Sequence, residues 1–205
     1  MELQQPRINP HLLYNSLSVM RWPALRRGDQ ATVNLIDAMT SYYRLALNKG
    51  NTIIPLSGEI EMVRQYVKIN ESAHSRRYEL RTDIPDDMLG EHIFKHLLQP
   101  IVENAILHGL NGREGAAVID IAGRRVGASM VIAVSDNGRG IDPQLLEAVR
   151  SMDRRPQIGG FGLRNVRARM AGYYGDAFGM SIDSRRGSGT VVTLTVPVMS
   201  KQELL

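Results

Sequence analysis

The chain has 205 residues, of which 43% are hydrophobic and 22% charged, values typical of one large or two small globular domains. It contains no cysteine, which excludes disulfides and thiolate metal sites, and no apolar run approaches the ~20 residues that span a bilayer. The net charge of +4 is modest, and arginine pairs such as Arg124-Arg125 are scattered among acidic residues, so we expect no nucleic-acid-binding surface.

Glycine is distributed unevenly along the chain. Residues 101–205 hold 15 of the 19 glycines. Helices disfavour glycine, whereas turns and loops use it. The sequence therefore predicts a helical front part, residues 1–52, followed by a mixed and loop-rich domain over residues 53–205.

The front part is predicted to form two helices joined by a turn at Gly28. Each helix carries one apolar stripe: Leu13, Leu17 and Met20 in the first, and Leu35, Met39, Tyr42 and Ala46 in the second. Pro23 is expected to kink or end the first helix. Two amphipathic helices bury little surface on their own, so we expect a homodimer in which two copies form a four-helix bundle.

A polar motif, I-N-P-H-L-L-Y-N, occupies residues 8–15. Pro10 either opens the helix with Asn9 as its cap or kinks a longer helix. His11 and Asn15 are four residues apart and share a helical face that is clear of the apolar stripe. An exposed histidine is commonly only a solvated side chain. The functional alternative is a nucleophilic imidazole, with Asn15 placed to position a ligand or water.

Between residues 51 and 109 the pattern predicts an extended piece at 52–56, a helix over 57–74, a strand over 78–84 and a helix over 91–109. Pro100 interrupts the hydrogen bonds of the last helix, which can therefore consist of two stacked pieces.

The polar side of that last helix carries Glu103, Asn104 and His108. The asparagine is either a structural hydrogen bonder or, through its carbonyl oxygen, a ligand suited to Mg²⁺. His92 and His96 have the spacing of a metal-binding pair on a helix. No third ligand is evident, so zinc is not expected.

The glycine-rich part contains two motifs that suit a nucleotide. Strands over 117–125 and 130–136 end in Asp136-Asn137-Gly138-Arg139-Gly140, which is either an ordinary hairpin turn or a site where the carboxylate accepts a hydrogen bond from an amino group such as that of adenine. A glycine-rich turn at 159–163 opens a helix to about residue 174, and free N–H groups at such a helix start suit a polyphosphate. A short helix over 143–152 lies between the motifs, and a hairpin of 180–184 with 190–196 follows them.

Several common nucleotide and nucleophile motifs are absent from the sequence. There is no G-x-x-x-x-G-K-[ST] and no G-x-G-x-x-G after an early strand, which excludes a P-loop and a dinucleotide fingerprint. There is also no G-x-S-x-G and no protein-kinase H-R-D set.

Together, residues 91–197 resemble the ATP-binding domain shared by sensor histidine kinases, DNA gyrase, Hsp90 and MutL. Residues 103–109 are similar to its N box, 136–140 to its first glycine box and 160–163 to its second, and Gly189-Thr190 matches the closing segment. The resemblance implies that Asn104 binds Mg²⁺ and that Asp136 reads adenine. It implies a pocket floor and lid hinges formed by Gly138, Gly140, Gly160 and Gly162. Further candidates for ATP contact are His108, Leu163 and Thr190, and Glu103 is a candidate catalytic residue.

The motif at residues 8–15 closely resembles the histidine box of the LytS/YesM-type sensor kinases. This resemblance implies that His11 is the phosphoacceptor, with Asn15 beside it. Leu12 stands where the family usually has Phe, and where many other histidine kinases have an acidic residue that could act as base. An imidazole with a pKa of ~6.5 is already partly unprotonated at neutral pH, so we assign no base.

As a member of this type, the chain is expected to have an α+β fold: a dimerising helical hairpin followed by a Bergerat-type ATP-binding α/β sandwich with a mixed, mainly antiparallel sheet. The expected activity is ATP- and Mg²⁺-dependent autophosphorylation of His11 and transfer to an aspartate of a response-regulator protein. The expected location is the cytoplasm, as the kinase core of an inner-membrane sensor whose membrane segments lie upstream.

Two alternatives remain at this point. The first is a scaffold or pseudokinase that binds ATP without transferring phosphate, and the intact box around His11 counts against it. The second is a stand-alone ATPase of the gyrase or Hsp90 kind. The position four residues before Asn104 is Pro100 rather than the glutamate that those ATPases use as base, which counts against the second.

Overall fold

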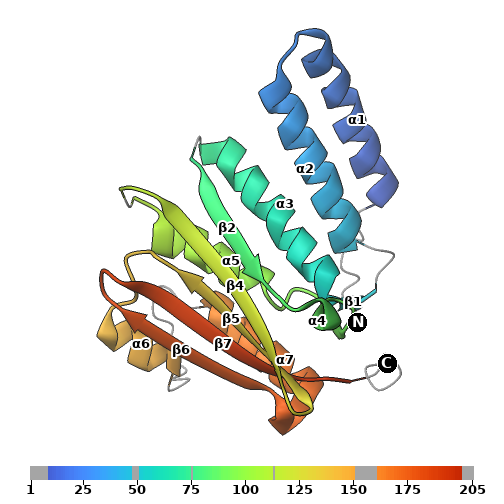
Figure 1. The fold of residues 1–205 in the computed structure, drawn as a ribbon. Coiled ribbons are helices and arrows are strands. Elements are labelled where there is room, and N and C mark those ends of the chain that lie inside the picture. Colours follow the sequence, from blue (N-terminus) through green and yellow to red (C-terminus); the bar gives the residue numbers. More distant parts are fainter. Residues whose placement is uncertain (1–8, 48–50, 75, 113, 151–160, 200–205) are drawn as a thin grey trace, which may run out of the picture. The chain divides into compact units, whose positions relative to one another are not determined.

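The computed structural model describes residues 9–47, 51–74, 76–112, 114–150 and 161–199. The chain divides into two compact units. One contains the first two helices together with Gln65–Arg76, and the other contains Thr52–Arg64 and the part of the chain from Arg77 onward (Figure 1). No helix among the described residues is both long enough and apolar enough to cross a bilayer.

The first unit is a hairpin of α1 (Pro10–Arg26) and α2 (Gln30–Leu47). The Asn9 side chain caps α1 by accepting a hydrogen bond from the His11 N–H at 3.0 Å. Pro10 lies in the first turn, where its missing N–H costs nothing. Pro10 therefore opens the helix, and Pro23 lies inside α1 without ending it.

Burial within the hairpin differs in part from the predicted stripes. Leu17 is buried, but Met20 is 61% exposed. In α2 the buried side chains include Val33 and Ile36, whereas Leu35 of the predicted stripe is only half-buried. The predicted stripe is rotated from the hairpin core, because helical spacing alone does not decide which of two neighbouring apolar faces packs against the next helix.

The second unit is built on a five-stranded sheet of order β2-β4-β5-β7-β6. Its strands are β2 (Tyr78–Asp83), β4 (Ala117–Val126), β5 (Ser129–Asp136), β6 (Gly179–Arg185) and β7 (Gly189–Pro197). β2 pairs parallel with β4 and the remaining pairs are antiparallel, which confirms the predicted mixed, mainly antiparallel sheet. Alternation along β5 buries its apolar side chains on one face of the sheet.

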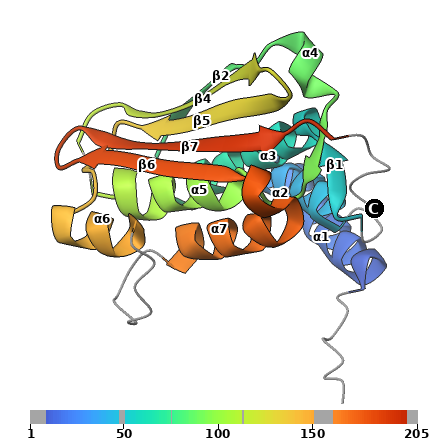
Figure 2. The same cartoon turned by 90° about the horizontal axis from the view of Figure 1, so that it is seen from below.

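Helices lie along one side of this sheet (Figure 2). They are α5 (Gln99–Asn104), which continues as the π-helix η2 (Ala105–Leu110), α6 (Pro143–Arg150) and α7 (Phe161–Tyr174). The remaining elements are β1 (Ile53–Pro55), α3 (Leu56–His74), α4 (Asp86–Leu89), β3 (His92–Phe94) and the short 3₁₀ turn η3 (Gly175–Ala177). The α+β fold class predicted from the sequence is confirmed.

The predicted helix over 91–109 is wrong in its first part. Its beginning forms β3, which pairs antiparallel with β1, Ile53 opposite Phe94. The pairing partner lies some forty positions away, so periodicity within the segment does not reveal it. Pro100 lies in the first turn of α5 and therefore starts that helix rather than interrupting it. His92 and His96 consequently do not share a helical face.

Candidate functional site

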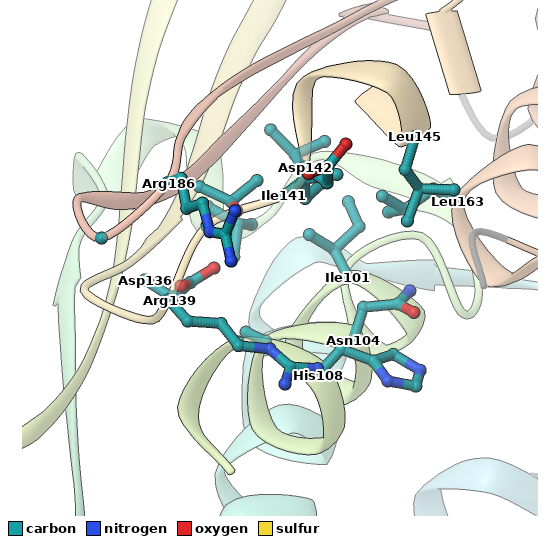
Figure 3. A pocket seen from close by; sticks show the side chains of 17 residues that line it. Ile101, Asn104, His108, Asp136, Arg139, Ile141, Asp142, Leu145, Leu163 and Arg186 are labelled. Carbon is teal, nitrogen blue, oxygen red and sulfur yellow. The ribbon is translucent and has the colours of Figure 1, made fainter. Parts of the chain in front are cut away.

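A cavity of about 720 Å³ lies between the helices and the end of β5, a volume within the usual range of small-molecule sites (Figure 3). It collects residues that are far apart in the sequence. Of the predicted site residues, its lining contains Asn104, His108, Asp136, Gly140, Leu163 and Thr190. Its apolar wall includes Ile101, Val134, Ile141, Leu145 and Val192.

Asp136 is the last residue of β5 and is half-buried. Its Oδ1 accepts a hydrogen bond from the Gly138 N–H at 2.8 Å. A Cβ added to Gly138 would lie 2.5 Å from that oxygen, and one added to Gly109 would lie 2.8 Å from it. These two glycines leave room for the carboxylate, because any larger residue would displace it.

The loop after Asp136 is fixed by backbone contacts on both sides. The Arg139 N–H donates to the Gly109 carbonyl at 2.9 Å, and the Arg139 carbonyl accepts from the Gly187 N–H at 2.7 Å. Gly140 has φ +71°, and a Cβ there would lie 2.2 Å from the Arg185 carbonyl oxygen. Backbone contacts thus hold the first glycine box between η2 and the β6–β7 turn.

Asn104 is the last residue of α5 and faces the cavity from the helical side (Figure 3). Its Nδ2 donates to the Pro100 carbonyl oxygen at 2.6 Å. Because that carbonyl can only accept, the amide is oriented with Oδ1 available to a ligand. A Cβ added to Gly162 would lie 2.7 Å from Asn104 Nδ2, so this glycine allows α7 to approach the asparagine.

The helix that carries Asn104 changes its winding directly after it. Ala105–Leu110 form a π-helix, an arrangement that occurs frequently at functional sites. His108 and Gly109 belong to this wider turn, and both line the cavity. Close to the end of this π-helix, the Gly109 carbonyl accepts the hydrogen bond from the Arg139 N–H of the first glycine box.

Two polar side chains that sequence reasoning missed hold the site together. Asn137 accepts from the Val118 N–H at 3.0 Å and donates to the Ala116 carbonyl at 2.9 Å, which ties the loop to the start of β4. Ser184 Oγ accepts from the Ile141 N–H at 2.8 Å and lies 3.0 Å from Thr190 Oγ1. Both residues act on distant partners, so no local spacing signals them.

Arg139 and Arg186 bring two positive charges to the cavity lining, and sequence reasoning did not single them out either. Figure 3 shows both on the side of Asp136. Within the described part of the chain neither guanidinium forms an ion pair. The lining therefore combines a carboxylate acceptor, an amide oxygen and uncommitted cations, which suits a ligand with an amino-bearing ring and an anionic end.

The other predicted site residues lie elsewhere. Glu103 is half-buried and does not line the cavity. Gly160 lies outside the described residues. His11 and Asn15 belong to the hairpin unit, where both are exposed, and the Asn15 amide lies 3.3 Å from His11 Nδ1.

Comparison with known families covers almost the whole chain. Residues 1–78 match the family model of histidine kinases. Residues 90–200, more than half of the chain, match that of the histidine kinase-, DNA gyrase B-, and HSP90-like ATPases.

Individual relatives agree with the family models. The chain is 30% identical over 193 residues to the sensor histidine kinase YesM of Bacillus subtilis (94% of this chain, 32% of the relative). It is 31% identical over 194 residues to the sensor histidine kinase YpdA of Escherichia coli K12 (94% and 33%), and 28% identical over 202 residues to the sensor protein LytS of Bacillus subtilis (97% and 34%). The chain thus spans about a third of the length of these relatives.

Solved structures share the fold. The histidine kinase domain of the Erythrobacter litoralis EL346 blue-light activated histidine kinase superposes with a TM-score of 0.54 at 16% identity, covering 95% of each chain. The catalytic domain of histidine kinase ThkA gives 0.54 at 17% identity over 72% of this chain and 96% of that domain. From the family matches and the relatives together, the chain belongs to the histidine kinase-, DNA gyrase B-, and HSP90-like ATPase family, among the sensor histidine kinases related to YesM and LytS.

Proposed function

We propose that this chain is the kinase core of a two-component sensor, which phosphorylates itself on His11 with ATP and passes the phosphoryl group to an aspartate of a response-regulator protein. One observation carries the proposal. The cavity contains a carboxylate, Asp136, enclosed by glycines, and an amide, Asn104, whose oxygen is available to a ligand. The same chain carries an exposed histidine, His11, in the first turn of a capped helix.

Each end of the cavity takes one part of ATP in this proposal. Asp136 accepts a hydrogen bond from the adenine amino group, and the apolar wall packs on the ring. Asn104 Oδ1, together with the nucleotide phosphates and water, would hold Mg²⁺, which favours oxygen ligands and retains several waters. When bound, Mg²⁺ neutralises phosphate charge. Arg139 and Arg186 add positive charge beside the bound nucleotide.

Among the described residues, the His11 ring has a hydrogen-bond partner at Nδ1. Asn15 Nδ2 lies 3.3 Å from Nδ1 and would donate to it in this orientation. Turning that amide over exchanges its donor for its acceptor. With the oxygen accepting from Nδ1–H, the lone pair is on Nε2, which attacks the γ-phosphorus while the bond to the ADP oxygen breaks. Asn15 would therefore select the reactive tautomer.

Dimerisation belongs to the same proposal. α1 exposes a set of large apolar side chains: Leu12 (66%), Val19 (70%), Met20 (61%) and Trp22 (66%). A second hairpin would cover these side chains in a four-helix bundle. In the whole protein, the core would lie in the cytoplasm, where ATP and response regulators are found.

The decisive test is incubation with γ-labelled ATP. We expect label that is stable in base and lost in acid, as a phosphoramidate is, and we expect His11→Gln to abolish it while ATP binding persists. His74→Gln is the matched control, because His74 is also an exposed histidine on a helix. ATP binding without label would favour the scaffold, and phosphate release without label would favour a stand-alone ATPase.

A further inference from the structure

One fully buried carboxylate lies outside the cavity and is not used by the proposed function. Glu59, in the first turn of α3, is 0% exposed. Its Oε1 accepts from the backbone N–H groups of Leu98 at 2.9 Å and Gln99 at 3.2 Å, and its Oε2 accepts from that of His96 at 2.9 Å. Burial raises the pKa of this carboxyl, and the three N–H groups oppose the rise.

Two of these donors open the helix α5. The first N–H groups of a helix have no partner within it and need one outside. Leu98 and Gln99 donate to Glu59. Pro100 has no N–H, and the Ile101 N–H donates to the Leu98 carbonyl at 3.0 Å. Glu59 thus supplies the external acceptor for both of these N–H groups at the helix start.

Pro100 connects the start of α5 to the cavity. Its carbonyl accepts from Asn104 Nδ2 at 2.6 Å, one turn along the helix. That bond sets which way the Asn104 amide turns. A displacement of the helix start moves the Pro100 carbonyl and hence the direction of Asn104 Oδ1.

The segment before α5 is also fixed from α7. The Phe94 N–H donates to the Tyr174 hydroxyl at 3.0 Å, and the Arg169 side chain donates to the His96 carbonyl. His96 has φ +60°, a conformation that residues with side chains rarely adopt. Such a residue persists only where its surroundings hold it, so this segment has one defined conformation that Glu59 helps to maintain.

We propose that Glu59 is a positioning residue for the nucleotide site: through Leu98, Gln99 and Pro100 it sets the direction of the Asn104 amide oxygen. This inference rests on the proposed function, because it assumes that Asn104 meets Mg²⁺ and ATP. Glu59 itself touches neither. It acts as the outer partners of metal ligands do, by orienting the group that binds.

The test compares Glu59→Gln with Glu61→Gln in the full chain by calorimetry, once with ATP and Mg²⁺ and once with ATP and a chelator. Gln keeps the size of Glu59 but points an N–H donor at backbone donors. We expect the gain in ATP affinity on adding Mg²⁺ to fall about tenfold, while affinity in chelator changes less than about twofold. Glu61, 43% exposed and 3.8 Å from Arg64, is the matched control and should change neither.

A double variant separates positioning from a general structural role. If Glu59 acts through Asn104, adding Glu59→Gln to Asn104→Ala leaves the response to Mg²⁺ at the level of Asn104→Ala alone. Equal loss of affinity with and without Mg²⁺, or an additive effect in the double variant, overturns the inference. Failure of the wild-type chain to bind ATP overturns the proposed function, and the inference with it.

If Glu59→Gln does not fold, hydrogen exchange of the wild-type chain tests the same inference. Coupling between two sites is reciprocal, so a metal-bound nucleotide must tighten the contact at Glu59. We expect the amides of Leu98 and Gln99 to exchange more slowly with ATP and Mg²⁺ than with ATP and chelator. Equal exchange in the two conditions overturns the inference.

Discussion

At the sheet end of the cavity Asp136 is enclosed by backbone, whereas at the helical end Asn104 is oriented by hydrogen bonds arranged in series. The glycines around Asp136 leave no room for a single added carbon. Gly162 also packs closely on Asn104, but the direction of the Asn104 amide is set by its hydrogen bond to the Pro100 carbonyl and, through it, by the start of α5. Close packing makes the Asp136 end rigid. At the Asn104 end, a change in any one hydrogen bond of the series can alter the direction of the amide. We therefore expect the two ends to respond differently to substitution.

The largest effect is expected where packing is tightest. Gly189 has φ +91°, and a Cβ there would lie 1.9 Å from the Asp136 carbonyl oxygen. Gly189→Ala should reduce the free energy of unfolding by roughly 2–5 kcal/mol, from backbone strain plus overpacking, as measured by urea unfolding. Gly187→Ala is the control: φ is +80° but nothing lies within 4 Å, so about 1–2 kcal/mol is expected. Equal losses would contradict the packing argument.

Asp136→Ala should weaken ATP binding by roughly 10- to 150-fold, because a hydrogen bond to a charged group contributes about 1.5–3 kcal/mol. The loss should be the same with Mg²⁺ and with chelator, since this end contacts the base and not the metal. Isothermal calorimetry measures both conditions. Asp120→Ala, a surface carboxylate on β4 that lies 3.8 Å from Arg81, is the control. A loss confined to Mg²⁺ would show that the two ends are wrongly assigned.

Asn104→Ala should give the complementary pattern. We expect ATP affinity to fall about tenfold in the presence of Mg²⁺ and to stay unchanged in chelator, because only one oxygen ligand is removed. Titration of Mg²⁺ at fixed ATP should show the same shift. An equal loss in both conditions would mean that Asn104 contacts the nucleotide itself.

The sequence predicts best those arrangements that involve neighbouring residues. Asp136 ends a strand two and four residues before glycines, and Asn9 caps a helix through the N–H of His11 two residues later, so both arrangements follow from short spacings. The alternating strands β4 and β5 follow from the same kind of pattern. Such features can be predicted from sequence because each is determined within a single helix, strand or turn.

The missed features depend on distant partners. β3 is three residues long and is a strand only because β1 pairs with it. Ser184 meets the loop at Ile141, and Glu59 meets backbone about forty positions later. A glutamate on an amphipathic helix ordinarily faces water. Spacing places Glu59 on the apolar face of its helix, three residues after Leu56 and four before Val63, but its backbone partners lie too far along the chain for the sequence to show them.

The smallest predicted effect concerns the fixed segment before α5. Tyr174→Phe removes the acceptor of the Phe94 N–H, and we expect a loss of about 1 kcal/mol in the free energy of unfolding at pH 8. Tyr173→Phe is the matched control: Tyr173 stacks on the same Phe94 ring at 3.8 Å, is 45% exposed, and should change little. Equal losses in the two variants would contradict a role for the hydroxyl.

The same pair predicts a dependence on pH. Burial raises the pKa of Tyr174 to about 12, against ~10 in an unfolded chain. A raised pKa gives stability that is fully present below pH ~10 and is lost as pH rises towards ~12, by roughly 2 kcal/mol. The wild type should therefore lose its stability advantage over Tyr174→Phe across this pH range. If the difference in free energy of unfolding between wild type and Tyr174→Phe stayed constant from pH 9 to 12, the pKa of Tyr174 would not be raised by its burial.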